Sequence, residues 1–209
     1  MASAPALDAT AFILAGGKST RMGMDKAFVE LNGRTLLARA LDLVRSVPLD
    51  VRIVGSREKF AHFAPVVEDV FPDRGPLAGI HAALRASNAE LNLMLAVDTP
   101  FVSSAFLQYL IKQIRSAPGT TVVVPRPEGL WQPLCAIYRR EFADAAETAL
   151  LAGRNRIDSL FAVAAVQTRT LDEDELKSNG FSIAMVRKMF RNLNTLEELK
   201  SEERVEEVK

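Results

Sequence analysis

Residues 14–26 read LAGGKSTRMGMDK, and this stretch decides how the rest of the chain is interpreted. It follows a short apolar run at 11–14 that predicts a buried strand, and it contains three glycines. It also places Lys18, Arg21 and Lys26 within nine residues. Glycines let backbone N–H groups approach a phosphate closely, and basic side chains add charge-assisted hydrogen bonds to its oxygens. The stretch therefore predicts a loop that binds a diphosphate or triphosphate.

Two other phosphate-binding motifs are excluded by the spacing. A Walker P-loop needs a glycine five positions before its Gly-Lys-Ser unit, whereas Phe12 occupies that position. The dinucleotide fingerprint with three spaced glycines is also absent from the sequence. The plain alternative is a surface loop with solvated charges, but the preceding strand, the clustered cations and a later acid favour a binding loop.

The composition excludes several classes of protein. The 209 residues include 26 basic and 26 acidic side chains, so nothing in the net charge predicts nucleic acid or an anionic membrane as a partner. The longest apolar run, 160–166, is far shorter than the roughly 20 residues of a membrane span. The single Cys135 cannot form an internal disulfide, and the N-terminus shows no signal-peptide pattern. We expect a soluble, cytoplasmic protein.

Short apolar runs alternate with longer amphipathic stretches, which is the pattern of a parallel sheet with helical connections. The expected strands are 11–14, 51–54, 92–97, 121–124, 134–138 and 165–169. The expected helices are 35–45, 77–86, 105–115, 141–151 and 195–208, with a turn at Asn32-Gly33. This order predicts an α/β, three-layer, Rossmann-like fold with a mostly parallel central sheet flanked by helices. In such folds ligands bind at the carboxyl ends of the strands.

Asp98 directly follows the strand expected at 92–97, whose last five residues are apolar, so its carboxylate is expected at that edge of the sheet. Mg²⁺ bound to a triphosphate needs such an oxygen ligand there. The alternative is that Asp98 caps the next helix, but Pro100 and the Ser103-Ser104 pair offer other helix starts. His62 and His81 lie in no motif and are expected to be surface or packing residues.

Four further segments accompany 14–26 in a fixed order: 75–79 (GPLAG), 98–101 (DTPF), 132–134 (QPL) and 192–195 (NLNT). With LAGGxSxRMGxDK, this set resembles the guanylyltransferases that attach GMP to the molybdenum cofactor. More broadly it resembles the nucleotidyltransferases that activate sugar and alditol phosphates. The resemblance covers nearly the whole chain. It implies one nucleotidyltransferase domain at 1–209, with a nucleotide-binding half at about 8–125 and an acceptor-binding half at about 126–209.

The resemblance also implies a reaction and a set of site residues. GMP would pass from GTP to the terminal phosphate of molybdopterin, giving molybdopterin guanine dinucleotide and pyrophosphate, with Mg²⁺ on Asp98. The implied catalytic residues are Arg21, Lys26 and Asp98. The implied nucleotide-binding residues are Leu14, Ala15, Gly16, Gly17, Lys26, Asp69 and Asp98. The implied acceptor-binding residues are Gly75, Gly79, Arg156, Asn192 and Asn194.

Two departures leave questions open. Gly55 stands where members of the family often have an asparagine near the base, so the preference for guanine over cytosine is less certain than the chemistry. The stretch 177–188 (KSNGFSIAMVRK) has no counterpart in the family pattern and could be a lid, a partner surface or an insertion.

Three other functions compete with the one that the resemblance implies. They are cytidylyl transfer to molybdopterin, activation of a sugar or alditol phosphate, and non-catalytic nucleotide binding or cofactor delivery. Docking to molybdoenzymes or to other cofactor-synthesis proteins is expected from the family.

Overall fold

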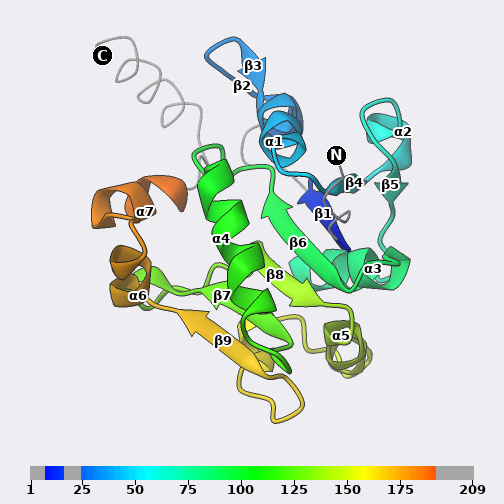
Figure 1. Ribbon diagram of the computed structural model, residues 1–209. Helices are drawn as coiled ribbons and strands as arrows, with labels where there is room; N and C mark the ends of the chain where they lie inside the picture. Colours follow the sequence, from blue (N-terminus) through cyan, green and yellow to red (C-terminus); the bar gives the residue numbers. More distant parts are fainter. Residues whose placement is uncertain (1–7, 17–24, 192–209) are drawn as a thin grey trace, which may run out of the picture.

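The computed structural model describes residues 8–16 and 25–191, which form a seven-stranded sheet between helices (Figure 1). The spatial order of the strands is β5-β4-β1-β6-β8-β7-β9. Their bounds are β1 Ala9–Leu14, β4 Asp50–Val54, β5 Val66–Val67, β6 Leu91–Ala96, β7 Val122–Pro125, β8 Cys135–Arg139 and β9 Thr168–Leu171. Only β8 runs antiparallel to its neighbours, so the expectation of a mostly parallel sheet in an α/β fold is confirmed.

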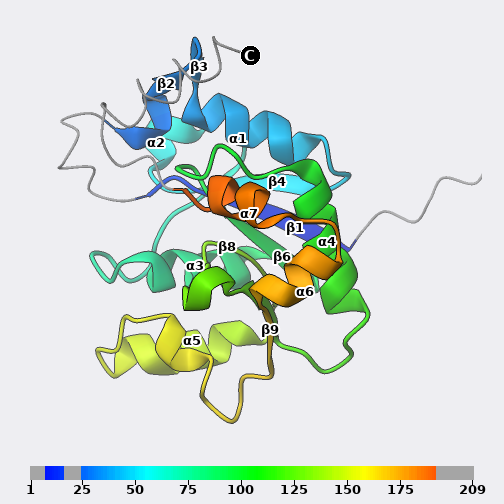
Figure 2. The same cartoon turned by 90° about the vertical axis from the view of Figure 1, so that its left-hand side faces the viewer.

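Helices cover both faces of this sheet. The α-helices are α1 Leu36–Arg45, α2 Arg57–Phe60, α3 Pro76–Ala86, α4 Ser104–Arg115, α5 Phe142–Leu151, α6 Glu173–Ser178 and α7 Ile183–Met189. Short 3-10 turns occur at η1 Lys26–Phe28, η2 Pro127–Gly129 and η3 Asp158–Leu160. Figure 2 shows α1 and α4 on one side of the sheet and α3 and α5 on the other. Two apolar clusters match these faces, one under α1, α4, α6 and α7 and the other under α3 and α5.

The local sequence explains where the main elements begin and why they are buried. The Thr35 hydroxyl accepts a hydrogen bond from the Ala38 N–H and caps α1, and the Ser103 hydroxyl caps α4 through the Phe106 N–H. All six residues of β6 are buried because helices cover both of its faces. This burial explains why five of its six residues are apolar, Asn92 being the exception.

A two-stranded hairpin, β2 Glu30–Leu31 and β3 Arg34–Thr35, precedes α1. Asn32 and Gly33 connect its strands with φ values of 53° and 69°, which suit a two-residue hairpin turn. The turn expected at Asn32-Gly33 is therefore confirmed. The two-residue strands are too short to produce an alternating pattern, so the sequence did not predict them.

Two expectations about the later part of the chain need comment. The strand expected at 165–169 lies instead at Thr168–Leu171, because the apolar residues before it form a turn in which Val166 is buried. The helix expected at 195–208 lies outside the described residues. The single-domain assignment for 1–209 also extends beyond them and stays a prediction.

The stretch 177–188, which lacked a family counterpart, forms the end of α6 and most of α7. Phe181, Val186 and Met189 are buried in the same apolar cluster as α4. The rings of Phe181 and Phe190 contact the ring of Phe106 at centroid distances of 5.2 and 5.6 Å. This stretch is therefore part of the helical layer over the sheet.

No helix in the described ranges 8–16 and 25–191 is long and apolar enough to cross a membrane.

Replacing Phe106 with alanine tests the α4–α7 packing. Phe106 of α4 is fully buried where α4 packs against the α7 segment. Phe106→Ala should therefore lower the free energy of unfolding by about 3–5 kcal/mol. Leu151→Ala is the matched control, because Leu151 is 73% exposed and its loss should change stability by less than about 0.5 kcal/mol. Urea unfolding followed by circular dichroism measures both values, and equal losses would contradict the packing.

Candidate functional site

The centre of the site is an ion pair between Lys26 and Asp98. The Lys26 Nζ donates a hydrogen bond to the Asp98 Oδ2 at 3.0 Å, and both side chains are 23% exposed. Lys26 begins η1, and Asp98 lies two residues beyond the end of β6. The parallel strands β1 and β6 are neighbours, and the Val97 N–H donates to the Leu14 carbonyl at 3.2 Å. This pairing brings two residues that are 72 positions apart to one edge of the sheet.

Asp25 fixes the backbone that carries Lys26. Its carboxylate accepts a hydrogen bond from the Ala27 N–H at 3.2 Å and caps η1. The same carboxylate binds the Lys59 Nζ at 2.7 Å, just before the end of α2. Asp25 therefore holds η1 against α2 and orients Lys26.

The alternative role of Asp98 as a helix cap is excluded, because Ser103 caps α4. The turn after β6 is held by Thr99, whose hydroxyl donates to the Ala96 carbonyl at 2.7 Å. The Asp98 side chain thus engages Lys26 at the sheet edge and not the start of the next helix.

The end of β1 lies beside the end of β4. Leu14 is the last residue of β1, and Ala15 and Gly16 follow it. The Ala15 N–H donates to the Val54 carbonyl at 3.0 Å, and the Gly55 N–H donates to the Val67 carbonyl at 3.0 Å. The ends of β1, β4 and β5 therefore form a continuous floor at the same edge. Gly17 and Arg21, which were predicted in the nucleotide site, lie outside the described residues.

The ring of Phe60 covers Gly55. A Cβ atom added to Gly55 would lie 2.8 Å from Cε2 of Phe60, too close for an ordinary contact. A larger residue at 55 would therefore need the ring to move. The place of the asparagine expected from the family is filled by this aromatic ring, which the sequence alone did not indicate because the contact depends on α2.

Asp69 lies two residues beyond β5, at the carboxyl edge beside the end of β4. Its Oδ1 accepts a hydrogen bond from the Phe71 N–H at 3.2 Å. The Asp69 carboxylate reaches solvent, but partial loss of hydration raises its pKa above the ordinary value. This effect outweighs the hydrogen bond from Phe71, which lowers the pKa. Its position is compatible with the predicted role in the nucleotide site.

Gly75 and Gly79 lie at the start of α3. Gly75 has a φ of 73° and precedes Pro76 at the first helical position, so a residue with a side chain would be strained there. A Cβ on Gly79 would lie 3.4 Å from Val54 Cγ1 and 4.0 Å from Leu14 Cδ2. Gly79 therefore lets α3 pack closely on the strand ends. Its predicted contact with the acceptor stays a prediction.

A hollow of about 450 Å³ opens beside Pro76. Its walls also include Gly129, Leu130, Trp131, Pro133, Asn155, Ile157 and Asp158. Because β8 is antiparallel to β6 and pairs Cys135 with Leu95, the residues just before β8 return to the edge where Asp98 lies. The hollow and the Lys26–Asp98 pair therefore share one edge of the sheet.

Charged and aromatic groups surround this hollow. The guanidinium of Arg126 lies 4.5 Å from the centre of the Trp131 ring. The predicted Arg156 is exposed and forms two hydrogen bonds with Asp158, at 3.2 and 2.7 Å, which lower the pKa of that carboxyl. The sequence analysis singled out Arg156 but missed Trp131, although it is the only tryptophan in the chain.

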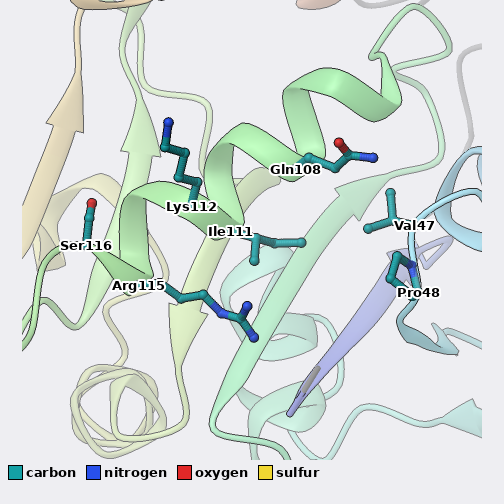
Figure 3. A pocket seen from close by; sticks show the side chains of 7 residues that line it. All are labelled: Val47, Pro48, Gln108, Ile111, Lys112, Arg115 and Ser116. Atoms are coloured by element: carbon teal, nitrogen blue, oxygen red, sulfur yellow. The ribbon is translucent and has the colours of Figure 1, made fainter. Parts of the chain in front are cut away.

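A larger hollow of about 650 Å³ lies elsewhere (Figure 3). It is lined by Val47, Pro48, Gln108, Ile111, Lys112 and Arg115, among others. These residues come from the loop before β4 and from the C-terminal half of α4, so the hollow lies near the amino ends of the strands. It does not adjoin Asp98 and is not part of the candidate site.

His81 lies on the buried face of α3 and is 3% exposed. Neither ring nitrogen has a hydrogen-bond partner in the described part of the chain, and the ring packs edge-on against Phe71 at 5.2 Å. Burial lowers the pKa of His81 below its ordinary 6.5, although Glu147 at 3.9 Å acts in the opposite direction. This is the environment of a packing histidine, as expected from the sequence.

An acid and a lysine joined beyond the end of the central strand, beside a glycine-containing strand end and a hollow, form an arrangement that suits a nucleotidyltransferase. The family described as "MobA-like NTP transferase domain" matches residues 11–170.

Two relatives cover nearly the whole chain. The molybdenum cofactor guanylyltransferase of Desulfosudis oleivorans is 36% identical over 93% of this chain and 94% of the relative. A probable molybdenum cofactor guanylyltransferase of Pelotomaculum thermopropionicum is 32% identical over 92% of this chain and 91% of the relative. The solved structure of molybdopterin-guanine dinucleotide biosynthesis protein A from Archaeoglobus fulgidus matches with a TM-score of 0.77 and 28% sequence identity. The match covers 96% of this chain and 100% of that structure's chain. The chain belongs to the family of molybdenum cofactor guanylyltransferases.

His81 predicts a pH dependence of stability. Because the pKa of His81 is lower in the folded protein than 6.5, the unfolded chain binds more protons as the pH falls below that value. Stability is thus lost on acidification, by at most about 1.4 kcal/mol per pH unit. His81→Leu removes this contribution, so its stability relative to wild type should rise between pH 7.5 and 5.5. Urea unfolding at several pH values measures the difference, and parallel curves would contradict the assignment.

Proposed function

We propose that the protein transfers GMP from GTP to the terminal phosphate of molybdopterin, producing molybdopterin guanine dinucleotide and pyrophosphate. The observation that carries this proposal is the Lys26–Asp98 pair at the shared end of β1 and β6. The names of the relatives that match over most of the chain support the choice of GTP and molybdopterin. The proposal concerns the substrates, because the family itself follows from the comparisons.

Mg²⁺ fits the donor set that the chain offers. This ion is usually held by one or two carboxylates together with phosphate oxygens and water. Among residues 8–16 and 25–191 no group of three acidic, histidine or cysteine side chains could hold a metal alone, so Asp98 would share it with the triphosphate. A bound Mg²⁺ would neutralise charge on the phosphate oxygens.

Lys26 supplies the second positive charge. Before substrate binds, its ammonium group is held beside the Asp98 carboxylate. In the proposed complex it would hydrogen-bond the oxygens on which negative charge gathers as pyrophosphate leaves. Phosphoryl transfer depends mainly on positioning and electrostatics, so fixed cations of this kind are the main catalytic contribution expected from the protein. Arg21 is proposed to act in the same way.

The reaction needs no general base. An oxygen of the acceptor phosphate attacks the α-phosphorus of GTP, the bond from that phosphorus to the bridging oxygen breaks, and pyrophosphate leaves with the electron pair. A phosphate monoester has a second pKa near 6 and is largely a dianion at neutral pH. The burial of His81 within α3 is consistent with a mechanism that uses no histidine.

The hollow beside Pro76 and Trp131 suits the acceptor. A pterin is flat and carries several hydrogen-bond donors, so an indole ring and the carboxylate of Asp158 match its shape and polarity. Asn155 adds an amide that can donate and accept, and Arg156 stands at the rim. Gly75 lies immediately before this wall. Asn192 and Asn194 are proposed acceptor residues outside the described ranges.

The base end of the site favours guanine. With Phe60 over Gly55, no side-chain amide reads the base from that position, and Asp69 lies two residues beyond the neighbouring strand β5. A carboxylate can accept two hydrogen bonds from the adjacent N–H groups of guanine, whereas cytosine offers one amino group. Asp69 is therefore proposed as the residue that selects GTP.

Two further proposals concern the cell. The buried free thiol of Cys135 suits a reducing cytoplasm, although burial also raises its pKa to about 12 and makes it inert. Delivery of the product to molybdoenzymes, or contact with other cofactor-synthesis proteins, would follow from the proposed reaction.

Pyrophosphate release tests the proposed reaction. Purified protein with Mg²⁺ is given GTP, CTP, ATP or UTP, with and without molybdopterin. Release should require GTP and molybdopterin together, because the acceptor phosphate is the nucleophile. Release with CTP instead would assign cytidylyl transfer, and release with a sugar or alditol phosphate alone would assign that activation reaction. GTP binding without release in any mixture would identify a non-catalytic binding protein.

A further inference from the structure

The α6–α7 segment is firmly attached to the helical layer over the sheet (Figures 1 and 2). Phe181, Val186 and Met189 are buried, and the rings of Phe181 and Phe190 pack edge-on against the Phe106 ring of α4, at centroid distances of 5.2 and 5.6 Å. Because its apolar side chains are buried in this way, α7 can act as a rigid support for whatever its polar side chains touch.

Arg187 joins α7 to the loop that forms one wall of the Trp131 hollow. Its Nε and Nη2 both donate to the Glu128 Oε1, at 2.9 and 2.6 Å. Glu128 lies in η2, and the next three residues, Gly129, Leu130 and Trp131, line the hollow. The ion pair therefore holds the loop directly before the wall residues.

Several contacts hold the ends of this loop. The Arg126 Nε donates to the Gly129 carbonyl at 3.2 Å, the Leu130 N–H donates to the Pro127 carbonyl at 2.9 Å, and the Trp131 ring packs against Phe161 at 4.8 Å. Glu128 adopts a left-handed backbone conformation with a φ of 50°, which is unfavourable for a residue with a side chain and persists only where the surroundings enforce it. Pro127 is buried, but Glu128 and Gly129 are exposed and Leu130 is 65% exposed. The Arg187 ion pair adds an anchor from outside the loop, at the residue with the left-handed backbone.

The neighbouring residue of α7 reaches the other side of the site. The Lys188 Nζ lies 4.9 Å from the centre of the Phe101 ring, within range of a cation–π interaction. Phe101 is three residues after Asp98 in the turn that follows β6. Consecutive residues of α7 therefore contact the turn that carries Asp98 and the loop that carries Trp131.

We propose that Arg187 is a positioning residue for the acceptor. By holding Glu128, it keeps the 126–131 loop and Trp131 in place relative to the Asp98 turn, and so keeps the acceptor hollow in its binding shape. The effect on acceptor binding rests on the proposed function, whereas the effect on the loop does not. The stretch that had no family counterpart would then be a support for the acceptor wall.

Fluorescence of the only tryptophan, Trp131, tests the loop directly and without any substrate. Arg187→Met and Glu128→Gln should each increase quenching of Trp131 by acrylamide. Because an exposed ion pair shifts a local equilibrium by at most about fivefold, the Stern–Volmer constant should rise within that range. Arg140→Met, an exposed arginine at the far end of β8, should leave it unchanged. Wild-type quenching in both loop variants would overturn the proposal.

Steady-state kinetics then test the consequence for the acceptor. Arg187→Met should raise KM for molybdopterin by about two- to fivefold and leave kcat and KM for GTP unchanged. The exchanged pair Glu128→Arg with Arg187→Glu should restore both KM and quenching. An equal rise in both KM values would overturn the acceptor-specific role. If quenching increases in the loop variants but the wild-type protein never uses molybdopterin, the role of Arg187 in holding the loop is supported and the proposed function is refuted.

Discussion

The hydrogen-bonded ion pair between Lys26 and Asp98 is the interaction on which the account of this site depends. It forms only if β1 and β6 are neighbours, because each residue follows one of these strands. A partly exposed ion pair contributes about 1 kcal/mol or less to stability, so the fold does not need it. Its importance lies in placing a cation beside the carboxylate that we propose as the Mg²⁺ ligand, at the edge of the sheet proposed to hold the triphosphate.

The sheet topology places the proposed acceptor hollow at the same edge as this pair. Four of the six pairings between neighbouring strands are parallel, as in an ordinary doubly wound domain, but β8 runs antiparallel to both of its neighbours. Because β8 begins at the carboxyl edge of the parallel strands, Trp131 and Pro133, which directly precede it, lie at that edge. The proposed nucleotide and acceptor sites can then lie next to each other without a second domain, and α7 contacts both sides through Arg187 and Lys188.

The sequence predicted those features that arise from local patterns. Continuous apolar runs located β1 and β6, and an acid directly after such a run located Asp98. The family followed from short motifs spread along the chain, and the comparisons confirm it. Contacts between distant elements were not predictable in this way. The ring of Phe60 over Gly55, the wall formed by Trp131 and the ion pair of Arg187 each depend on two segments whose proximity no periodicity reveals. Very short strands such as β5 leave no pattern either.

The most direct test of the central claim is the effect of Mg²⁺ on GTP affinity, measured by isothermal titration calorimetry for wild type and Asp98→Asn. Asp50→Asn, at the exposed amino end of β4, serves as the control. The account predicts that Mg²⁺ tightens GTP binding in wild type and in the control, and that Asp98→Asn loses most of this gain because its amide is a weaker metal ligand. An equal gain from Mg²⁺ in all three proteins would contradict the assignment of Asp98, and with it the proposed arrangement of the site.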